Sequence, residues 1–206
     1  MKKYMILSVV VSLFLFSYGC SSIRNVVNTF ENIKRLQFKL DSVDNFRLCG
    51  INLSSKSSIS DFTITEAATL TSSFANSQLP ASLVLNVEAR NPNDGTGGSS
   101  QTSATLTSFE WDLYIDDIKT VNGNIANPIT IPGTGSSTVI PLSISVDIFQ
   151  FFSSQSYDRL INLALALGGY NSSPTRLKLV AKPRISTMFG DLYMGSVTIT
   201  DREFSN

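Results

Sequence analysis

The chain has 206 residues, enough for one domain with a sizeable hydrophobic core. Its 16 basic and 16 acidic residues balance, and without Lys2 and Lys3, which lie in a segment we expect to be removed, 14 basic residues remain and the net charge is −2. This gives no electrostatic reason to bind nucleic acid. Histidine is absent, so the commonest general base and metal ligand are missing. We therefore predict no catalytic residues, no metal site and no cofactor.

Residues 1–19 have the pattern of a secretory signal peptide. Lys2 and Lys3 give a positive start, and residues 4–16 are apolar apart from two serines. Thirteen helical residues reach roughly 20 Å, short of the roughly 30 Å hydrocarbon core of a bilayer. This length favours a signal peptide over a membrane span.

The next residues resemble a lipobox, the motif in which a cysteine is acylated and the chain is cut before it. Gly19 and Cys20 match it, and Ser17 is acceptable, while Tyr18 is bulkier than the usual Ala or Ser. We predict lipidation of Cys20, with residues 20–35 as a tether. The alternatives are an ordinary secretory peptide and an uncleaved anchor. Several acyl chains, at about 0.8 kcal/mol per buried methylene, would hold the chain on a membrane.

The predicted location is the outer membrane, with the domain facing the periplasm. No acidic run follows Cys20, and Ser21 is not an acidic retention signal of the kind known from enteric bacteria. Surface display is the alternative. Cys49 is the second of two cysteines and has no partner if Cys20 is acylated, so we interpret it as a buried, inert thiol within an apolar run.

The first half of the predicted domain, residues 36–206, alternates like half-buried strands. Leu36, Phe38 and Leu40 lie two apart, and Gly50 marks a bulge or bend. Thr63 and Glu66 form a capping box before a short helix. Further alternating segments predict strands, and they cover residues 81–89, 109–115 and 139–146. Asp116-Asp117 and Asn122-Gly123 are turn signals.

The second half changes its period. Residues 147–169 have helical spacing, with Asp147 as a cap and Gly168-Gly169 as the stop. Strand spacing returns at residues 177–181, a loop with Pro183 and Gly190 follows, and a last strand holds Val197 and Ile199. Strands and helices do not alternate as in a parallel sheet. The sequence predicts a mainly β protein, an antiparallel β-sandwich of the fibronectin type III or immunoglobulin kind with appended short helices.

One ordered set of features resembles a known family. The strand ending in Asn91-Pro92-Asn93 precedes a variable loop, an aromatic hairpin and the step Ile131-Pro132-Gly133. This order resembles the late-embryogenesis-abundant group 2 proteins, also called the water-stress and hypersensitive-response domain, over about residues 36–204. The resemblance implies a β-sandwich, no enzymatic activity and a role in stress protection. It also implies that Asn91, Pro92 and Asn93 form a structural turn.

Two further groups of side chains are candidate functional sites. The carboxylate pairs are the only acid–base candidates, and we interpret them as solvated surface residues: Glu110 with Asp112, Asp116 with Asp117, and Asp201 with Glu203. An aromatic and aliphatic stripe either lines a hydrophobic groove or caps the end of the sandwich; it comprises Phe149, Phe151, Phe152, Tyr157, Leu160 and Leu163.

These features predict a membrane-anchored, non-enzymatic lipoprotein of the cell envelope that acts as a binding, structural or stress-protective module. Its partners would be the membrane, through Cys20, and lipid or envelope proteins, but not nucleic acid. The alternative is a carrier of lipid or another hydrophobic ligand, with a groove between the sandwich and the helices.

Overall fold

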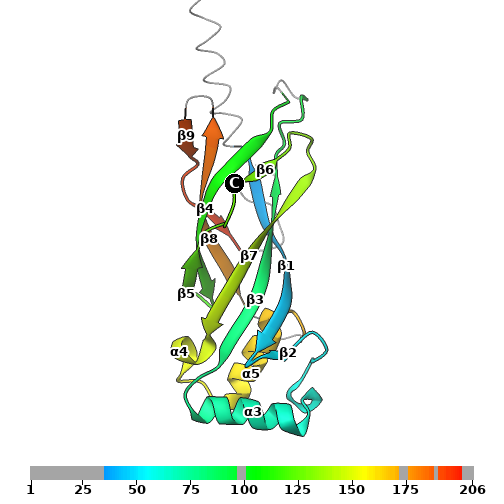
Figure 1. The fold of residues 1–206 in the computed structure, drawn as a ribbon, viewed down its shortest axis with the longest axis vertical. Coiled ribbons are helices and arrows are strands. Elements are labelled where there is room, and N and C mark those ends of the chain that lie inside the picture. Colours follow the sequence, from blue (N-terminus) through cyan, green and yellow to red (C-terminus); the bar gives the residue numbers. More distant parts are fainter. Residues whose placement is uncertain (1–34, 97–100, 172–175, 188–189, 201–206) are drawn as a thin grey trace, which may run out of the picture.

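The computed structural model describes residues 35–96, 101–171, 176–187 and 190–200. About half of these residues lie in two antiparallel sheets that face each other along an elongated body (Figure 1). The first sheet has the order β2-β1-β3-β7, and its strands are β1 (Gln37–Leu48), β2 (Ile51–Asn52), β3 (Pro80–Arg90) and β7 (Ser137–Asp147).

The second sheet has the order β10-β8-β4-β5, with two short strands paired beside this path. Strand β6 pairs with β4, and β9 pairs with β8. The strands are β4 (Ala104–Ile115), β5 (Ile118–Gly123), β6 (Ile129–Ile131), β8 (Leu177–Thr187), β9 (Gly190–Tyr193) and β10 (Val197–Ile199). The predicted antiparallel β-sandwich with appended short helices is confirmed.

The helices gather at one end of the sandwich, while β1 begins at the other end (Figure 1). They are the 3-10 helix η1 (Ile59–Asp61) and the α-helices α3 (Ile64–Ala75), α4 (Ile148–Phe152) and α5 (Tyr157–Leu167). No helix in the described part of the chain has both the length and the apolar character needed to cross a membrane.

The core lies between the two sheets and extends under the helices as one continuous cluster of buried apolar side chains. Alternation along the strands produces this arrangement, because every second side chain of a strand points to the same face. In β3, for example, Leu83, Leu85 and Val87 are buried, whereas the side chains between them are more exposed. The Phe38 ring of β1 packs on the Phe109 ring of β4, with centroids 5.4 Å apart, and joins the sheets.

Local signals for helix ends and turns are confirmed in detail. The Thr63 side chain accepts a hydrogen bond from the Glu66 amide, and the Glu66 carboxylate accepts one from the Thr63 amide. The Asp147 carboxylate caps α4 through the Phe149 amide at 3.1 Å. Asp116 and Asp117 both have positive φ, as the turn between β4 and β5 requires.

Two turn predictions are wrong. Asn122-Gly123 is not a turn but the end of β5, where Gly123 lies against the Trp111 ring and a Cβ would collide with it. Pro183 is not in a loop but inside β8. On the side of β8 that faces away from β4, residues 179–181 pair with β10 and residues 184–187 pair with β9. Pro183 lies between these two pairings, so its missing amide removes no hydrogen bond from either of them.

Candidate functional site: a pocket beside strand β1

The Asn91-Pro92-Asn93 segment forms a buried joint in the turn after β3. The Asn91 side-chain amide donates hydrogen bonds to the carbonyl oxygens of Thr102 (2.8 Å) and Ile131 (3.3 Å). Its oxygen accepts from both the backbone and side-chain amides of Asn93, at 3.1 and 2.8 Å. Asn91 is fully buried and Asn93 nearly so. These contacts hold the segment before β4 against the end of β6. All of them are made to other residues of this chain.

The Ile131-Pro132-Gly133 step completes this joint. A Cβ at Gly133 would collide with the backbone oxygens of Thr102 and Asn93, so only glycine fits between them. The two motifs that lie forty residues apart in the sequence therefore touch in the fold. Their function in this structure is to hold the loops at one end of the sandwich.

The aromatic stripe of the helical region lies at the opposite end. The Phe149 and Tyr157 rings meet the Phe74 ring of α3 edge-on, each with a centroid distance of 5.5 Å. The remaining members pack on the core: Phe152 and Leu160 are buried, and Phe151 and Leu163 are partly buried. None of these side chains lines the pocket or the void described below. The structure places them as a link between α3 and the helices α4 and α5.

A pocket of about 220 Å³ opens instead between β1 and the end of α5, which lie beside each other in Figure 1. Its wall comes from both sheets and from the helix end. It comprises Leu40–Val43 of β1, Leu85 of β3, Ala166–Gly169, Leu177 of β8, and Thr200 after β10. The volume exceeds that of a 150 Å³ engineered cavity that binds benzene, so a small apolar group fits.

A smaller void of about 10 Å³ lies next to this pocket, in the core. Four side chains line both spaces, namely Val43, Leu85, Leu167 and Leu177. The other six side chains around the void are also apolar: Phe46, Leu83, Leu113, Ile115, Val146 and Ile148. The void is at the lower limit for a single water molecule and offers such a molecule no polar partner. The pocket therefore has a polar rim and an apolar floor.

Two irregularities in β1 frame the pocket. The pairing of β1 with β3 shifts between Leu40 and Ser42, which leaves Asp41 as an extra residue. It shifts again between Asp44 and Arg47, where Asn45 has a φ of 53°. Such bulges bend a strand and re-aim its side chains, and they occur often next to functional sites. Here they bend β1 at the point where the pocket opens.

The helix end on the other side of the pocket is also well defined. The Tyr170 amide donates to the Leu165 carbonyl oxygen, and the Gly169 amide donates to that of Ala166, both at 2.9 Å. Gly169 has a φ of 71°, so these two bonds form a Schellman motif. The Tyr170 ring folds back over Gly168, where a Cβ would collide with it. The predicted stop at Gly168-Gly169 is thus a rigid wall of the pocket.

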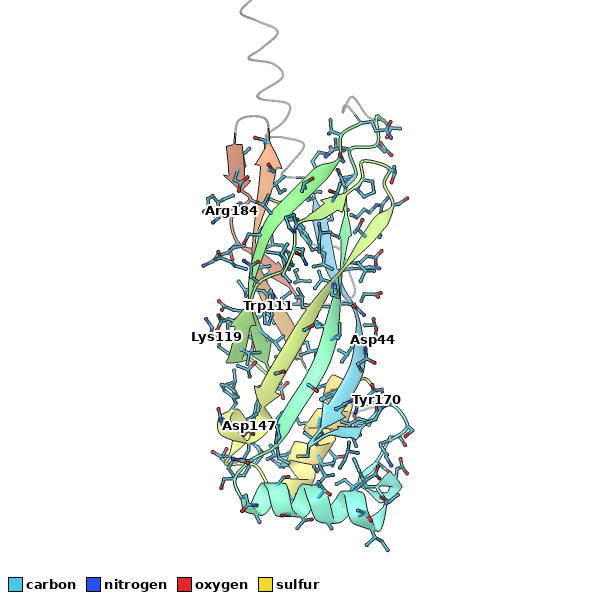
Figure 2. All side chains as sticks on the ribbon, in the orientation of Figure 1. Asp44, Trp111, Lys119, Asp147, Tyr170 and Arg184 are labelled. Atoms are coloured by element: carbon cyan, nitrogen blue, oxygen red, sulfur yellow. The ribbon has the colours of Figure 1, made fainter. Side chains whose placement is uncertain are left out.

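Charge at the rim is negative. Asp41 is the one charged residue among the described residues that line the pocket. Asp44 lies nearby on β1, and together with partial burial it raises the pKa of Tyr170, with burial as the larger cause. Figure 2 shows Asp44 and Tyr170 on the β1 side of the molecule, whereas Lys119 lies on the far side at β5. Lys39 of β1 is engaged by Glu88, 2.5 Å away.

The predicted carboxylate pairs that the structure describes lie at the surface. Asp112 is 2.8 Å from the Lys119 ammonium, while Glu110 is exposed. The Lys178 ammonium, also at 2.8 Å, holds the pKa of Asp117 below its ordinary value. Asp201 and Glu203 lie outside the described residues, as does Cys20. The described residues contain no group of three His, Cys, Asp or Glu side chains that could hold a metal ion.

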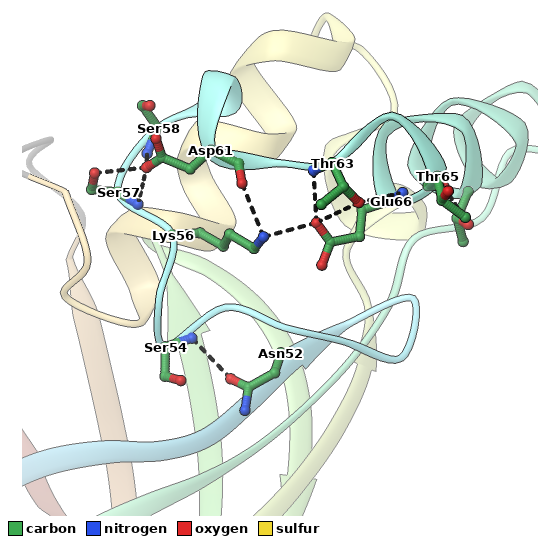
Figure 3. Close-up of polar contacts among 10 residues, drawn as sticks. Asn52, Ser54, Lys56, Ser57, Ser58, Asp61, Thr63, Thr65 and Glu66 are labelled. Atoms are coloured by element: carbon green, nitrogen blue, oxygen red, sulfur yellow. Dashed lines mark hydrogen bonds and ion pairs between the residues drawn. The ribbon is translucent and has the colours of Figure 1, made fainter.

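A polar clasp fastens η1 to the start of α3 (Figure 3). The Lys56 ammonium donates to the Glu66 carboxylate at 2.8 Å and to the Asp61 carbonyl oxygen at 2.9 Å. The Asp61 carboxylate accepts from Ser57 and Ser58, and these bonds lower its pKa to about 2. The lysine also lowers the pKa of Glu66. Every member of the clasp is engaged within it, so it stabilises the loop rather than binding a ligand.

Cys49 lies in the two-residue turn between β1 and β2. It is half-buried, and desolvation raises the pKa of its thiol above the ordinary value, so little thiolate forms near neutral pH. The prediction of a buried thiol is therefore met only in part, while the raised pKa is consistent with an inert one.

The fold defines the class of protein, a two-sheet antiparallel β-sandwich with helices at one end. No protein-family model matches the chain. Among curated proteins, no match is found.

Two solved structures are similar to it. One is a protein from Archaeoglobus fulgidus, with 13% identity, a TM-score of 0.35, and 79% of this chain and 94% of that chain covered. The other is a solution structure described as a "putative late embryogenesis abundant (LEA) protein", with 14% identity, a TM-score of 0.37, and 93% and 87% covered.

Proposed function

We propose that this chain is a non-enzymatic lipoprotein of the cell envelope, held on a membrane by acyl chains on Cys20. The observation that carries the proposal is the position of Cys20, directly after an apolar segment too short to span a bilayer. The sandwich would then act as a binding or structural module beside the membrane, with the outer membrane and a stress-protective role as the finer expectations.

The arrangement of the domain supports this proposal. Strand β1, which follows the tether, begins at the end of the sandwich opposite the helices (Figure 1). Twelve residues of strand span roughly 40 Å. A tether entering at β1 would hold the sandwich by one end and present α3, α4 and α5 away from the bilayer.

The state of the polar groups also supports a role without catalysis. The Asn91 side chain bonds to the Thr102 backbone oxygen and to the Asn93 side chain, and Asp112 and Asp117 are paired with lysines at the surface. A catalytic acid–base pair needs two groups with separated pKa values in a shared cleft. The candidate acid–base carboxylate pairs that the structure describes do not line the pocket beside β1.

The experiment is metabolic labelling with radioactive palmitate in a bacterium that expresses the full chain. We expect label on the native chain and on Cys49→Ala, and none on Cys20→Ala. The Cys49→Ala variant controls for loss of a thiol as such. Equal labelling of Cys20→Ala and the native chain, or no label on either, would overturn the proposed anchor.

A further inference from the structure

The pocket beside β1 is one feature of the described molecule that neither the anchor nor the structural motifs explain. Its volume is more than ten times that of the adjacent void, and four side chains line both spaces. Natural cores leave few voids larger than a water molecule, because close packing of side chains stabilises them. A pocket with a void beneath it, beside a strand with two bulges, therefore needs an explanation.

The lining indicates what kind of group would enter. Leu40, Val43 and Leu177 offer apolar surface with no hydrogen-bonding group in their side chains. Burial of apolar ligand area there is favourable by about 25 cal/mol per Å². Against this apolar part of the wall a polar group would lose its water contacts without replacement, so a hydrocarbon group is favoured there.

The rim indicates the charge of the outer part. Asp41 stands at the mouth as an exposed carboxylate, and Asp44 adds a second negative charge on the same strand. The Asn86 side-chain amide donates to the Ser42 hydroxyl at 3.0 Å and to the Asp44 carboxylate at 2.6 Å, which holds this edge of β1 in place. Among the described lining residues there is no Lys or Arg to receive an anionic head group.

We propose that the pocket binds the aliphatic chain of a single-chain amphiphile whose head group bears an ammonium. The chain would enter between β1 and the end of α5, with the ammonium beside the Asp41 carboxylate. This inference rests on the proposed function only in taking the domain to be a binding module. It does not require the anchor, so binding and lipidation can fail independently.

The test uses residues 21–206, which contain the whole of the described core, after circular dichroism and cooperative thermal unfolding show that they fold. Calorimetric titration compares three ten-carbon probes below their micellar concentrations: decyltrimethylammonium, 1-decanoylglycerol and decanoate. We expect saturable binding of one decyltrimethylammonium per chain. We expect affinity to fall through decanoylglycerol to decanoate, with roughly three- to tenfold between the two charged probes, because an exposed carboxylate has a modest effect.

Two variants with a matched control locate the site. Ala166→Trp fills the pocket and should weaken binding at least tenfold, whereas Ala68→Trp, on the exposed face of α3, should leave it unchanged. Asp41→Lys changes an exposed side chain and should reverse the order of the two charged probes without affecting folding.

Absence of saturable binding would overturn the inference. So would equal binding by Ala166→Trp and Ala68→Trp, or a native preference for decanoate over decyltrimethylammonium. If Ala166→Trp fails to fold, the reversal by Asp41→Lys still decides the question.

Discussion

At the scale of single residues, Asn91 shows how a sequence motif acquires a physical meaning. Its side chain is fully buried and makes four hydrogen bonds, two to backbone oxygens and two with Asn93. A side chain of another shape could not make all four. The sequence predicted a turn at Asn91, Pro92 and Asn93. It did not predict burial of the asparagines, because the partners Thr102 and Ile131 are brought there only by the pairing of β4 and β6.

Replacing this asparagine should therefore destabilise the domain strongly. We expect Asn91→Ala to lower the free energy of unfolding by about 2–4 kcal/mol, since backbone oxygens of the buried joint lose their donor. Asn122→Ala, at an exposed position of β5, should change it by less than about 0.5 kcal/mol. Urea unfolding of both variants measures the difference, and equal effects would show that the joint is not stabilising.

Asp61 gives a prediction about pH. Bonds from Ser57 and Ser58 lower its folded-state pKa from 3.8 to about 2, so the carboxylate stabilises the fold when ionised. Its contribution is fully present above pH 3.8 and is lost as the pH falls toward 2. We expect the stability difference between the native chain and Asp61→Asn to shrink over this window in acid titrations followed by urea unfolding. A difference that is constant from pH 6 to pH 2 would contradict this account.

At the scale of elements, local signals predicted helix ends and strands well, but missed features that depend on distant neighbours. The Thr63 and Glu66 box and the Gly168-Gly169 stop are confirmed because their chemistry lies within one or two turns of chain. The loop prediction at Pro183 was wrong because a proline is tolerated inside β8 only at the point where the pairing partner changes from β10 to β9. The pocket had no signal in the sequence, since it joins a bulge in β1 to a helix end more than 120 residues later.

The start of α3 can be tested at this scale. Thr63→Ala removes the side-chain acceptor of the capping box and should lower the free energy of unfolding by about 1 kcal/mol. Thr69→Ala, at an exposed position within the same helix, should leave it unchanged or slightly higher, since alanine favours a helix more than threonine does. Thermal unfolding distinguishes the two, and a larger loss from Thr69→Ala would contradict the role of the box.

For the whole molecule, we expect the end of the sandwich where β1 begins to face the bilayer and the helical end to face away from it. Ser137 pairs with Arg90 at the end where β1 begins, whereas Ile64 is 91% exposed at the helical end. In the lipidated Cys49→Ala chain on vesicles, a fluorophore on Ser137→Cys should be quenched by a head-group acceptor more strongly than one on Ile64→Cys. Stronger quenching at position 64 would show that the helices face the bilayer.

The location and the orientation of the domain both depend on a mature chain that starts at an acylated cysteine. Mass spectrometry of the N-terminal peptide, from protein purified out of cell membranes, tests this directly. The account predicts a peptide that begins at Cys20 and carries the added mass of a diacylglyceryl group. A mature chain that begins at another residue, or an unmodified Cys20, would contradict it.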